Sequence, residues 1–594
     1  MAKKPAKEKL PRWDLSHLYT SPKDHAVARD LAQIDKETAG FAKQYQGKVG
    51  KLSAEALAEA LRQYEQMQER SGKLGSFAQL LYASDMSNPA HTQFYQNIME
   101  ALTTYSSRLV FFTLELNRIS DDLLVKHYKS SARLRHYRPW LEAVRSFKPY
   151  QLSDALERYI HEQSVTQASW VRLFDESIAR LSFKVKGKKL SSAEVFDLMS
   201  HRDGKTRKAA AREIARVFAA EAPTYTLITN TLAKSKQIED STRGFASPIS
   251  SRNVANQVED EVVEALLTTV QANYAKLSHR YYRWKARQFG VKKLNYWDRN
   301  APLPKGDDKT IPYKKAVELV LASYREFSPE MAEIGTRFFK ENWVDVPVSP
   351  GKAPGAFAHP TVPSAHPYLL LNYQGKIRDV MTLAHELGHG VHQVLSARQG
   401  ALMCDTPLTL AETASVFGEM LTFQSLLAQM KDKKKRRLLI ASKVEDMLNT
   451  VVRQVAFCMF ERKLHAARRK GELSTAELGA LWLEVQRESL GPAIKLAPEY
   501  QHYWMYIPHF IHTPFYVYAY AFGDCLVNSL YGVYQREKKA GRGVAFAEKY
   551  ITMLSAGGTL RHKELLAPFG LDATRPDFWQ EGLNVISGYI DALE

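Results

Sequence analysis

Cysteine is scarce in this chain of 594 residues, which contains only Cys404, Cys458 and Cys525. The number is odd and the three positions lie far apart. The sequence therefore offers neither a disulfide framework nor a CxxC metal motif. We expect the three side chains to be reduced thiols in packed positions.

Long apolar runs are also missing. No uninterrupted apolar stretch reaches about 18–20 residues, the length that spans a membrane. The first twelve residues, up to Arg12, lack the apolar segment of a secretory signal. Hydrophobic residues nevertheless make up 45% of the chain, enough for a large core. These features favour a soluble cytoplasmic protein with no membrane partner, and the length allows more than one domain.

Acidic residues are outnumbered by basic ones, 64 against 82, which gives a formal net charge of +18. A balance of this kind raises nucleic acid as a partner. The basic residues, however, gather at the N-terminus or at expected helix junctions, and no nucleic-acid fold signature accompanies them. We predict solvated surface and no nucleic-acid partner. The clusters are Lys3–Lys9, Lys184–Lys189, Lys431–Arg437 and Arg536–Arg542.

The pattern that organises the chain is His385-Glu-Leu-Gly-His389. Helical residues four apart share one face, so both imidazoles can point at a single ion. This is the His-Glu-x-x-His arrangement of zinc peptidases, in which the histidines ligate Zn²⁺ and the glutamate, here Glu386, acts as a base on water. The alternative is a pair of packed or solvated histidines. Gly388 and Gly390, which remove bulk near the metal face, favour the ion site.

A hydrolytic zinc site needs a third protein ligand and one open position. Residues 408–421 are predicted to form a second helix that carries Glu412 and Glu419, seven residues apart on one face. Glu412 lies 412 − 389 = 23 residues beyond His389, enough chain for a loop and a second helix alongside the first. We assign Glu412 as the third ligand, ahead of Cys404. Glu419 is expected to hold a ligand imidazole by its other nitrogen, the alternative being a surface carboxylate.

An aromatic-rich segment follows residue 500, and such segments are most often core. His509, His512, Tyr516 and Tyr520 nevertheless recur at spacings of three and four residues. A stripe of hydroxyls and imidazoles is unfavourable to bury without partners. Peptide hydrolysis needs hydrogen-bond donors for the oxyanion, which neutral tyrosine and histidine provide. We predict that role for His509, Tyr516 and Tyr520, with Tyr518 a weaker candidate on the opposite side.

The remaining pattern is largely helical, with apolar residues at three- and four-residue spacing over 53–81 and 93–116. Residues 181–190 alternate around a glycine and predict a hairpin at a domain boundary. We therefore expect a mostly α-helical protein with an N-terminal helical domain and a larger catalytic domain that includes a small β-sheet. The predicted domains are residues 1–190 and 191–594.

A proline-rich stretch over 343–372 precedes the histidine motif and contains two short extended pieces, Gly355–Ala358 and Tyr368–Asn372. Unpaired backbone groups of such a strand can bind a peptide substrate as an added strand. We expect a substrate to lie along Tyr368–Asn372, the alternative being a small sheet that braces the helix.

These motifs together resemble the zinc metallopeptidases of the oligoendopeptidase F family, relatives of thimet oligopeptidase. The resemblance spans nearly the whole chain. Thimet-type relatives carry a glycine-rich loop before their catalytic tyrosines, whereas this chain has Thr513-Pro-Phe there and sides with oligoendopeptidase F. The segments that carry the resemblance are Trp13–Tyr19, Leu369–Gly375, His385–His389, Leu410–Glu419 and Ile507–Gly523.

The resemblance implies an endopeptidase that cleaves internal bonds of short peptides, with one Zn²⁺ per chain and a substrate channel flanked by helical domains. It also implies that the histidine and tyrosines of the aromatic segment contact substrate and the tetrahedral intermediate. One alternative is an exopeptidase of the dipeptidyl carboxypeptidase type. A second, from another class, is a basic helical protein that binds nucleic acid and carries a non-catalytic zinc.

Overall fold

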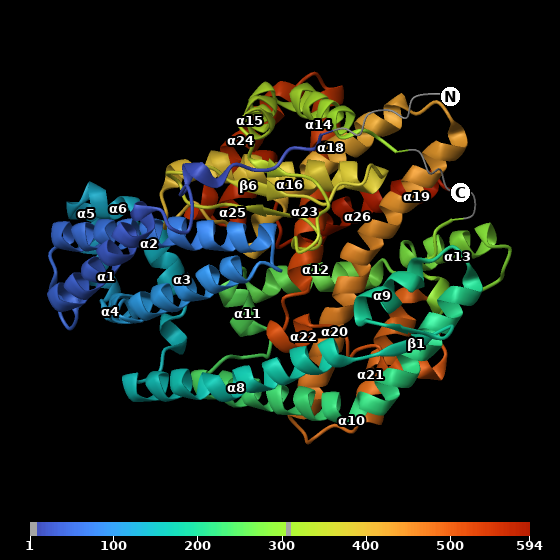
Figure 1. Cartoon of the computed structure of the whole chain (residues 1–594), viewed down its shortest axis with the longest axis horizontal. Helices are drawn as coiled ribbons and strands as arrows, with labels where there is room; N and C mark the ends of the chain where they lie inside the picture. The colour runs from blue at the N-terminus through green and yellow to red at the C-terminus, as the bar shows by residue number, and fades with distance from the viewer. Residues whose placement is uncertain (1–8, 304–309) are drawn as a thin grey trace. The chain divides into compact units, whose positions relative to one another are not determined.

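The computed structural model describes residues 9–303 and 310–594, most of which are helical (Figure 1). The prediction of a mostly α-helical protein with a small sheet is confirmed. None of the described helices combines the length and apolar character needed to cross a membrane.

The chain packs into two compact units, each assembled from three segments. The predicted domains over 1–190 and 191–594 are divisions of the sequence and stay a prediction. The first unit comprises Met1–Lys148, Asp308–Gln429 and Val533–Gly570, and the second comprises Pro149–Asp307, Met430–Gly532 and Leu571–Glu594.

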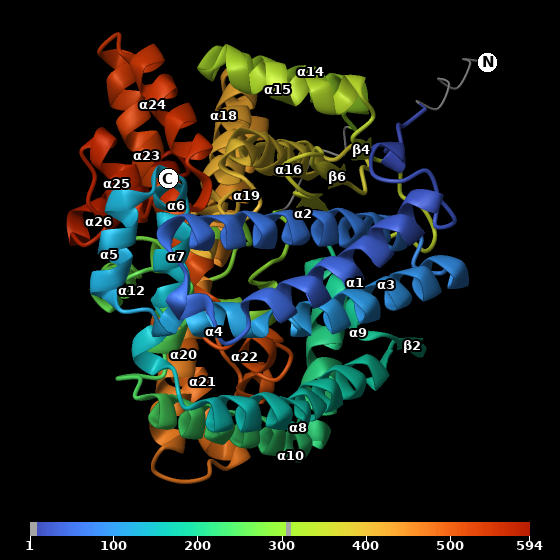
Figure 2. The same ribbon diagram turned by 90° about the vertical axis from the view of Figure 1, so that its left-hand side faces the viewer.

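Seven helices make up the N-terminal part of the first unit. The apolar faces of six of them meet around Phe41, Leu61 and Phe112, all of which are buried, and α3 packs against α2. Helices α2 and α3 run side by side in both views (Figure 1, Figure 2). The seven are α1 (His25–Tyr45), α2 (Ala54–Ser84), α3 (Pro89–Ser107), α4 (Val110–Arg118), α5 (Asp121–Ser130), α6 (Ala132–His136) and α7 (Arg138–Arg145).

Two of the predicted helices can be compared directly with this part of the structure. The helix expected over 53–81 is confirmed as α2, which begins after Ser53 because that hydroxyl accepts a hydrogen bond from the Ala56 N–H. The helical pattern expected over 93–116 is also confirmed, although the segment is not continuous. It is two helices, α3 and α4, with a turn between them at Arg108, whose guanidinium donates to the Asp35 carboxylate at 2.7 Å.

The rest of the first unit surrounds the histidine motif, which lies on α16. Helix α16 packs against α18 and also contacts α14, α15 and α24. The helices here are α14 (Tyr313–Phe327), α15 (Pro329–Lys340), α16 (Ile377–Ser396), α17 (Leu408–Ala411), α18 (Thr413–Gln429), α24 (Gly543–Ser555) and α25 (His562–Leu566).

A three-stranded sheet precedes α16 and consists of β4 (Val344–Asp345), β5 (Phe357–His359) and β6 (Tyr368–Leu370). Strand β6 is central, parallel to β4 and antiparallel to β5. Because β6 is paired on both sides, the expectation that a substrate adds to the strand at Tyr368–Asn372 is wrong. The buried Lys352 ammonium fixes the loop between β4 and β5 by donating to the carbonyls of Pro347 (2.8 Å) and Leu371 (2.6 Å).

The second unit is also helical. The hairpin expected over 181–190 is confirmed as β1 (Phe183–Val185) and β2 (Lys188–Leu190), joined by Lys186 and Gly187, both with positive φ as a tight hairpin turn requires. A second pair, β3 (Leu294–Asn295) and β7 (Ile494–Lys495), is parallel. The helices are α8 (Asp154–Arg180), α9 (Ser192–Asp197), α10 (Gly204–Arg243), α11 (Ser250–Ala255), α12 (Asp260–Ala272), α13 (Ser278–Gln288), α19 (Lys433–Thr450), α20 (Val452–Arg468), α21 (Thr475–Leu490), α22 (His509–His512), α23 (Tyr518–Lys539) and α26 (Pro576–Asp591), with α23 passing into the first unit after Gly532.

Helices α16 and α18 approach closely because position 388 is glycine. A Cβ atom on Gly388 would lie 2.5 Å from the Ala414 carbonyl oxygen and 2.7 Å from the Ser415 Cα. Both atoms belong to the α18 backbone and cannot move aside like the end of a side chain. The absence of a side chain at Gly388 therefore sets the distance between the two helices.

We predict that Gly388→Ala lowers the free energy of unfolding by about 1–3 kcal/mol, the usual range for overpacking. Gly40→Ala is the matched control, because Gly40 lies inside α1 and its Cβ would meet open space. That substitution should stabilise the protein by roughly 0.5–1 kcal/mol. Thermal unfolding of both variants provides the comparison, and a Gly388→Ala protein as stable as the wild type would refute the packing argument.

Candidate active site

The two motif histidines share one face of α16, with ring centroids 4.9 Å apart. The start of this helix is fixed by Asp379, whose carboxylate accepts hydrogen bonds from the backbone N–H groups of Gln374 (2.8 Å) and Lys376 (2.9 Å). His385 and His389 are partly buried. Their predicted convergence on one point is observed.

Glu412 completes the cluster. Its Oε2 lies 3.3 Å from His385 Nε2 and 3.5 Å from His389 Nε2. One ligand atom from each of the three residues lies within 4.8 Å of the others. Two imidazole nitrogens and a carboxylate oxygen are a donor set that suits Zn²⁺, so the residues present fit the metal expected from the sequence.

The single helix expected over 408–421 is wrong, and the difference shapes the site. The chain forms two helices, α17 and α18, and Glu412 is the residue between them. The Ser415 hydroxyl donates to Glu412 Oε2 at 2.6 Å. The Tyr550 hydroxyl donates to the backbone carbonyl of Thr413, the first residue of α18, at 2.8 Å. Ser415 was not identified from the sequence, where it is an ordinary small residue one turn beyond an acid.

Glu419 lies against the other nitrogen of His385, with Oε2 3.4 Å from Nδ1. This contact turns Nε2 of His385 toward Glu412. Burial alone would lower the pKa of His385, but the Glu419 hydrogen bond and the charges of Glu412, Glu386 and Glu419 together raise it to about 9. For Glu412 the balance is opposite: burial favours a higher pKa, yet His389, His385 and Ser415 lower it to about 2.

Glu386 is buried, with 8% of its surface exposed. Burial raises the pKa of its carboxyl, and the charges of His385 and His389 oppose that shift. The backbone N–H of Ala358 in β5 also donates to this carboxyl. Because the contact comes from a strand remote in sequence, spacing gave no indication of Ala358.

Cys404, the weaker candidate ligand, is outside the cluster. Among the described residues, His385, His389 and Glu412 form the one group arranged to hold a metal ion. The thiol is half-buried, and burial raises its pKa to about 12. Cys458 and Cys525 are buried free thiols, as expected.

The second unit contains the aromatic cluster. His509 Nε2 and the Tyr520 hydroxyl are 3.2 Å apart. The Tyr516 ring stacks on His509 at 5.7 Å and meets Tyr520 edge-on at 5.1 Å. These contacts bring the three predicted residues together. All three side chains are partly exposed.

The predicted helical stripe through these residues is wrong, because the chain leaves the helix between α22 and α23. His512 turns away and lies 2.7 Å from the Asp175 carboxylate. Tyr518 is fully buried, and its hydroxyl accepts from the Asn256 amide at 2.9 Å. It therefore belongs to the core and not to the cluster.

Glu461 on α20 supports the turn that replaces the stripe. Phe515 adopts φ +61°, an uncommon conformation for a residue with a side chain. Its N–H donates to Glu461 Oε1 at 2.7 Å. Glu461 is 1% exposed, and burial raises its pKa to about 8. In the sequence, Glu461 is an acidic residue next to an apolar run of a predicted helix, which indicates a buried carboxylate that needs a hydrogen-bond partner. The sequence does not indicate that this partner is the Phe515 N–H.

Comparison with known proteins adds family evidence to this geometry. Residues 197–585 match the model of peptidase family M3, and residues 115–183 match a model described as oligopeptidase F. The first match covers well over half of the chain. The chain belongs to peptidase family M3. The cluster of His385, His389 and Glu412 lies within the matched region, as do Glu386 and the aromatic cluster.

Relatives of this M3 chain extend over its full length. It is 26% identical over 600 residues to an oligoendopeptidase F homolog of Lactococcus lactis subsp. lactis, covering 99% of this chain and 97% of the relative. A Chlamydophila abortus structure described as a peptidase has a TM-score of 0.85 at 24% identity, covering 98% and 97% of the two chains. Oligoendopeptidase-F from Enterococcus faecium has a TM-score of 0.72 at 20% identity, covering 95% and 98%.

The two structures share the fold of this chain. The resemblance to oligoendopeptidase F is confirmed, and membership of family M3 makes the chain a metalloendopeptidase.

The raised pKa of His385 gives a prediction for metal binding. A group whose pKa is about 9 without metal carries its proton at pH 7 and must release it to become a ligand. Zinc affinity should therefore fall as pH drops, by about tenfold per unit below pH 9. Titration calorimetry at pH 7 in buffers of different ionisation enthalpy should show close to one proton released.

Glu419→Gln is the control for this experiment. It removes the negative partner of His385 Nδ1, so the pKa of His385 should fall and the number of protons released at pH 7 should decrease. A binding enthalpy that does not depend on the buffer would contradict the assignment of His385 as a protonated group.

Proposed function

We propose that this family M3 chain binds one Zn²⁺ through His385, His389 and Glu412 and hydrolyses internal bonds of short, unstructured peptides. One observation supports the proposal above all others. Three donor atoms from α16 and the α17–α18 junction converge within 4.8 Å, and Glu386 follows His385 directly in the sequence. Membership of a metallopeptidase family gives this cluster its chemical context.

When bound, Zn²⁺ supplies Lewis-acid chemistry, which makes a water molecule more acidic and a peptide carbonyl more electrophilic. In our proposal Glu386 is the base that takes the proton of the attacking water and then passes it to the leaving nitrogen. Its burial supports this role, because the raised pKa brings the carboxyl closer to neutral pH. Glu419 keeps His385 oriented through Nδ1.

Strand β5 is our candidate for the surface that holds the substrate backbone. Within residues 9–303 and 310–594 it is an edge strand, paired with β6 on one side. Strand β5 contacts α16, and the Ala358 backbone contributes to the pKa of Glu386, so β5 lies beside the proposed base. A peptide added to this edge would be held by its main chain, with little demand on side-chain sequence. This modifies the sequence expectation, which placed the substrate on the neighbouring strand.

His509, Tyr516 and Tyr520 are proposed to donate hydrogen bonds to the oxyanion of the transition state. Burial lowers the pKa of His509, which keeps its imidazole neutral at pH 7. The mutual contacts of the three side chains and their partial exposure support a polar surface available to a ligand. Neutral donors of this kind stabilise developing negative charge.

Glu386→Gln tests the proposed base. The variant keeps the side-chain shape and the metal ligands, so it should hold about one zinc per chain and hydrolyse peptides at least ~100-fold more slowly.

Glu412→Ala should instead lose zinc, because two histidines alone bind it weakly. Tyr520→Phe in the same assay should lower kcat more than it changes KM.

Elemental analysis and initial rates on one fluorogenic peptide separate the cases. Near-normal turnover by zinc-loaded Glu386→Gln would exclude Glu386 as the base, and full zinc in Glu412→Ala would exclude the third ligand.

The substrate class is tested with a mixture of a flexible peptide of about ten residues and a stably folded protein. Backbone must be exposed to add to β5, and opening a stable fold costs several kcal/mol. We expect internal cleavage of the peptide and survival of the folded protein, followed over time by mass spectrometry. Rapid fragmentation of the folded protein would refute the substrate proposal. Release of terminal residues alone would point to the exopeptidase alternative.

A further inference from the structure

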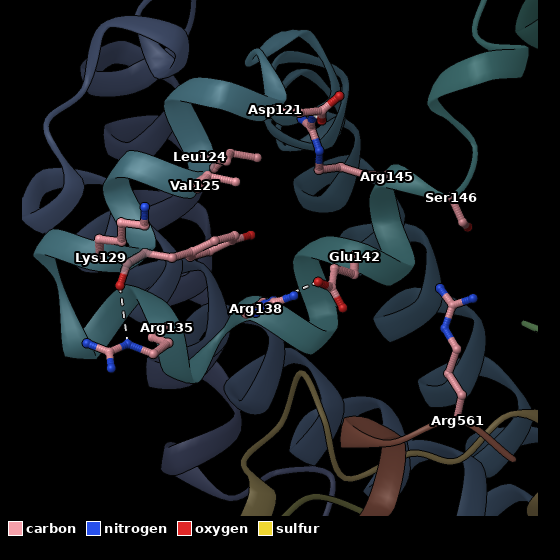
Figure 3. Close-up of a pocket in the computed structure, with 11 residues that line it drawn as sticks. Asp121, Leu124, Val125, Lys129, Arg135, Arg138, Glu142, Arg145, Ser146 and Arg561 are labelled. Carbon is pink, nitrogen blue, oxygen red and sulfur yellow. Dashed lines mark hydrogen bonds and ion pairs between the residues drawn. The ribbon is translucent and has the colours of Figure 1, made fainter. Parts of the chain in front are cut away.

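A cavity separate from the metal cluster opens in the first unit. It has a volume of about 770 Å³. It is bordered by α5, α6, α7 and Arg561, the residue before α25 (Figure 3). That volume lies in the range of small-molecule sites, roughly 300–1,000 Å³. Neither the proposed peptidase chemistry nor the aromatic cluster uses any of the residues that line it.

Cationic side chains outnumber acidic ones among the residues that line the cavity. Five are cationic and two acidic, a formal excess of 5 − 2 = +3. Each acid is already paired: Glu142 binds Arg138 at 2.7 Å and Asp121 binds Arg145 at 2.5 Å. The excess therefore belongs to the three other cationic side chains, Lys129, Arg135 and Arg561.

No carboxylate of the described residues pairs with those three cationic groups. The Arg135 guanidinium donates to a backbone carbonyl, that of Tyr128, at 3.2 Å. Lys129 and Arg135 lie on one side of the cavity and Arg561 on the other (Figure 3). A compact ion meets one side of such a site, whereas an elongated anion with several charges can reach both.

The position of Arg561 is fixed by its backbone. Just before it, Gly557 and Gly558 pack against the loop after α16, where a Cβ on either glycine would come within 2.5 Å of a backbone carbonyl oxygen. The Gly558 N–H donates to the Met403 carbonyl at 2.8 Å. Arg561 is thus presented by a rigid segment, which reduces the ordering cost of binding a ligand.

Part of the cavity is apolar. Val125 lines it and is 50% exposed, whereas the neighbouring Leu124 is buried in the core. The Tyr128 ring also contributes, with the Arg138 guanidinium 5.7 Å from its centroid. A ligand that fills the site therefore combines several negative charges with an uncharged, partly apolar portion.

We propose that this cavity binds an organic polyphosphate of nucleotide size, with its phosphates between Lys129, Arg135 and Arg561 and its uncharged portion on Val125 and the Tyr128 ring. Guanidinium groups suit phosphate because they donate two parallel hydrogen bonds to its oxygens. An acidic peptide shares the negative charge, and guanidinium also pairs with carboxylates, but each carboxylate carries one charge on a separate flexible side chain, whereas a polyphosphate carries several charges in one compact chain. Phosphate is therefore the favoured chemistry.

The experiment is titration calorimetry of the full-length protein with ATP, with pyrophosphate and with a hexaglutamate peptide, at about 0.1 M salt to screen weak surface attraction. We expect saturable binding of ATP, with pyrophosphate weaker because it lacks the uncharged portion. Arg135→Ala and Arg561→Ala should each weaken ATP binding about tenfold or more, since each removes a charge-assisted contact. Arg561→Lys should fall between Arg561→Ala and the wild type.

Arg133→Ala is the matched control. Arg133 also lies on α6, but it pairs with Glu59 and does not line the cavity, so its loss changes the net charge equally and should leave ATP binding unchanged. Peptide hydrolysis by each variant verifies that it is folded, and heat from removal of bound zinc by ATP would be common to all variants. An equal effect in Arg133→Ala, an absence of saturable phosphate binding, or binding of hexaglutamate alone would overturn the proposal.

Discussion

The candidate active site depends on the close contact between α16 and α18. Gly388 lets the α18 backbone approach to a distance that no side chain would allow, and Glu412 stands at the start of that helix. The carboxylate therefore reaches both imidazoles, 3.3 and 3.5 Å from their Nε2 atoms. Ser415 and Glu419, one and two turns along α18, then hold Glu412 and His385 in place. A single glycine thus connects helix packing to the geometry of the proposed metal site.

Local periodicity was sufficient to identify the first half of this site. Helical spacing places His385 and His389 on one face whatever surrounds them, and the structure agrees. The placement of Glu412 needed an assumption about how the next segment folds back, and the position was right although the helix expected there is broken at that residue. Ser415 and the Ala358 N–H were not predicted because their roles arise from tertiary contacts that leave no periodic trace.

The sheet and the aromatic segment both show that local sequence patterns do not predict long-range contacts. Extended pieces were expected before α16, but their order in the sheet is a long-range property, and the strand chosen for the substrate proved to be the central one. In the aromatic segment the spacing selected His509, Tyr516 and Tyr520, which do cluster. They do so across a turn with positive φ at Phe515, held by Glu461. Contacts between residues far apart in sequence therefore determine which side chains suggested by a local pattern lie close together in the structure.

X-ray absorption at the zinc edge of the purified, active protein tests the central claim most directly, because it reports the atoms bound to the metal. We predict two imidazole nitrogens and at least one carboxylate oxygen at roughly 2.0–2.2 Å. The outer scattering of two histidine rings should be present in the wild type and reduced in His389→Ala. A sulfur neighbour near 2.3 Å, the distance of a zinc–thiolate bond, or a spectrum unchanged in His389→Ala would contradict the assignment of His385, His389 and Glu412.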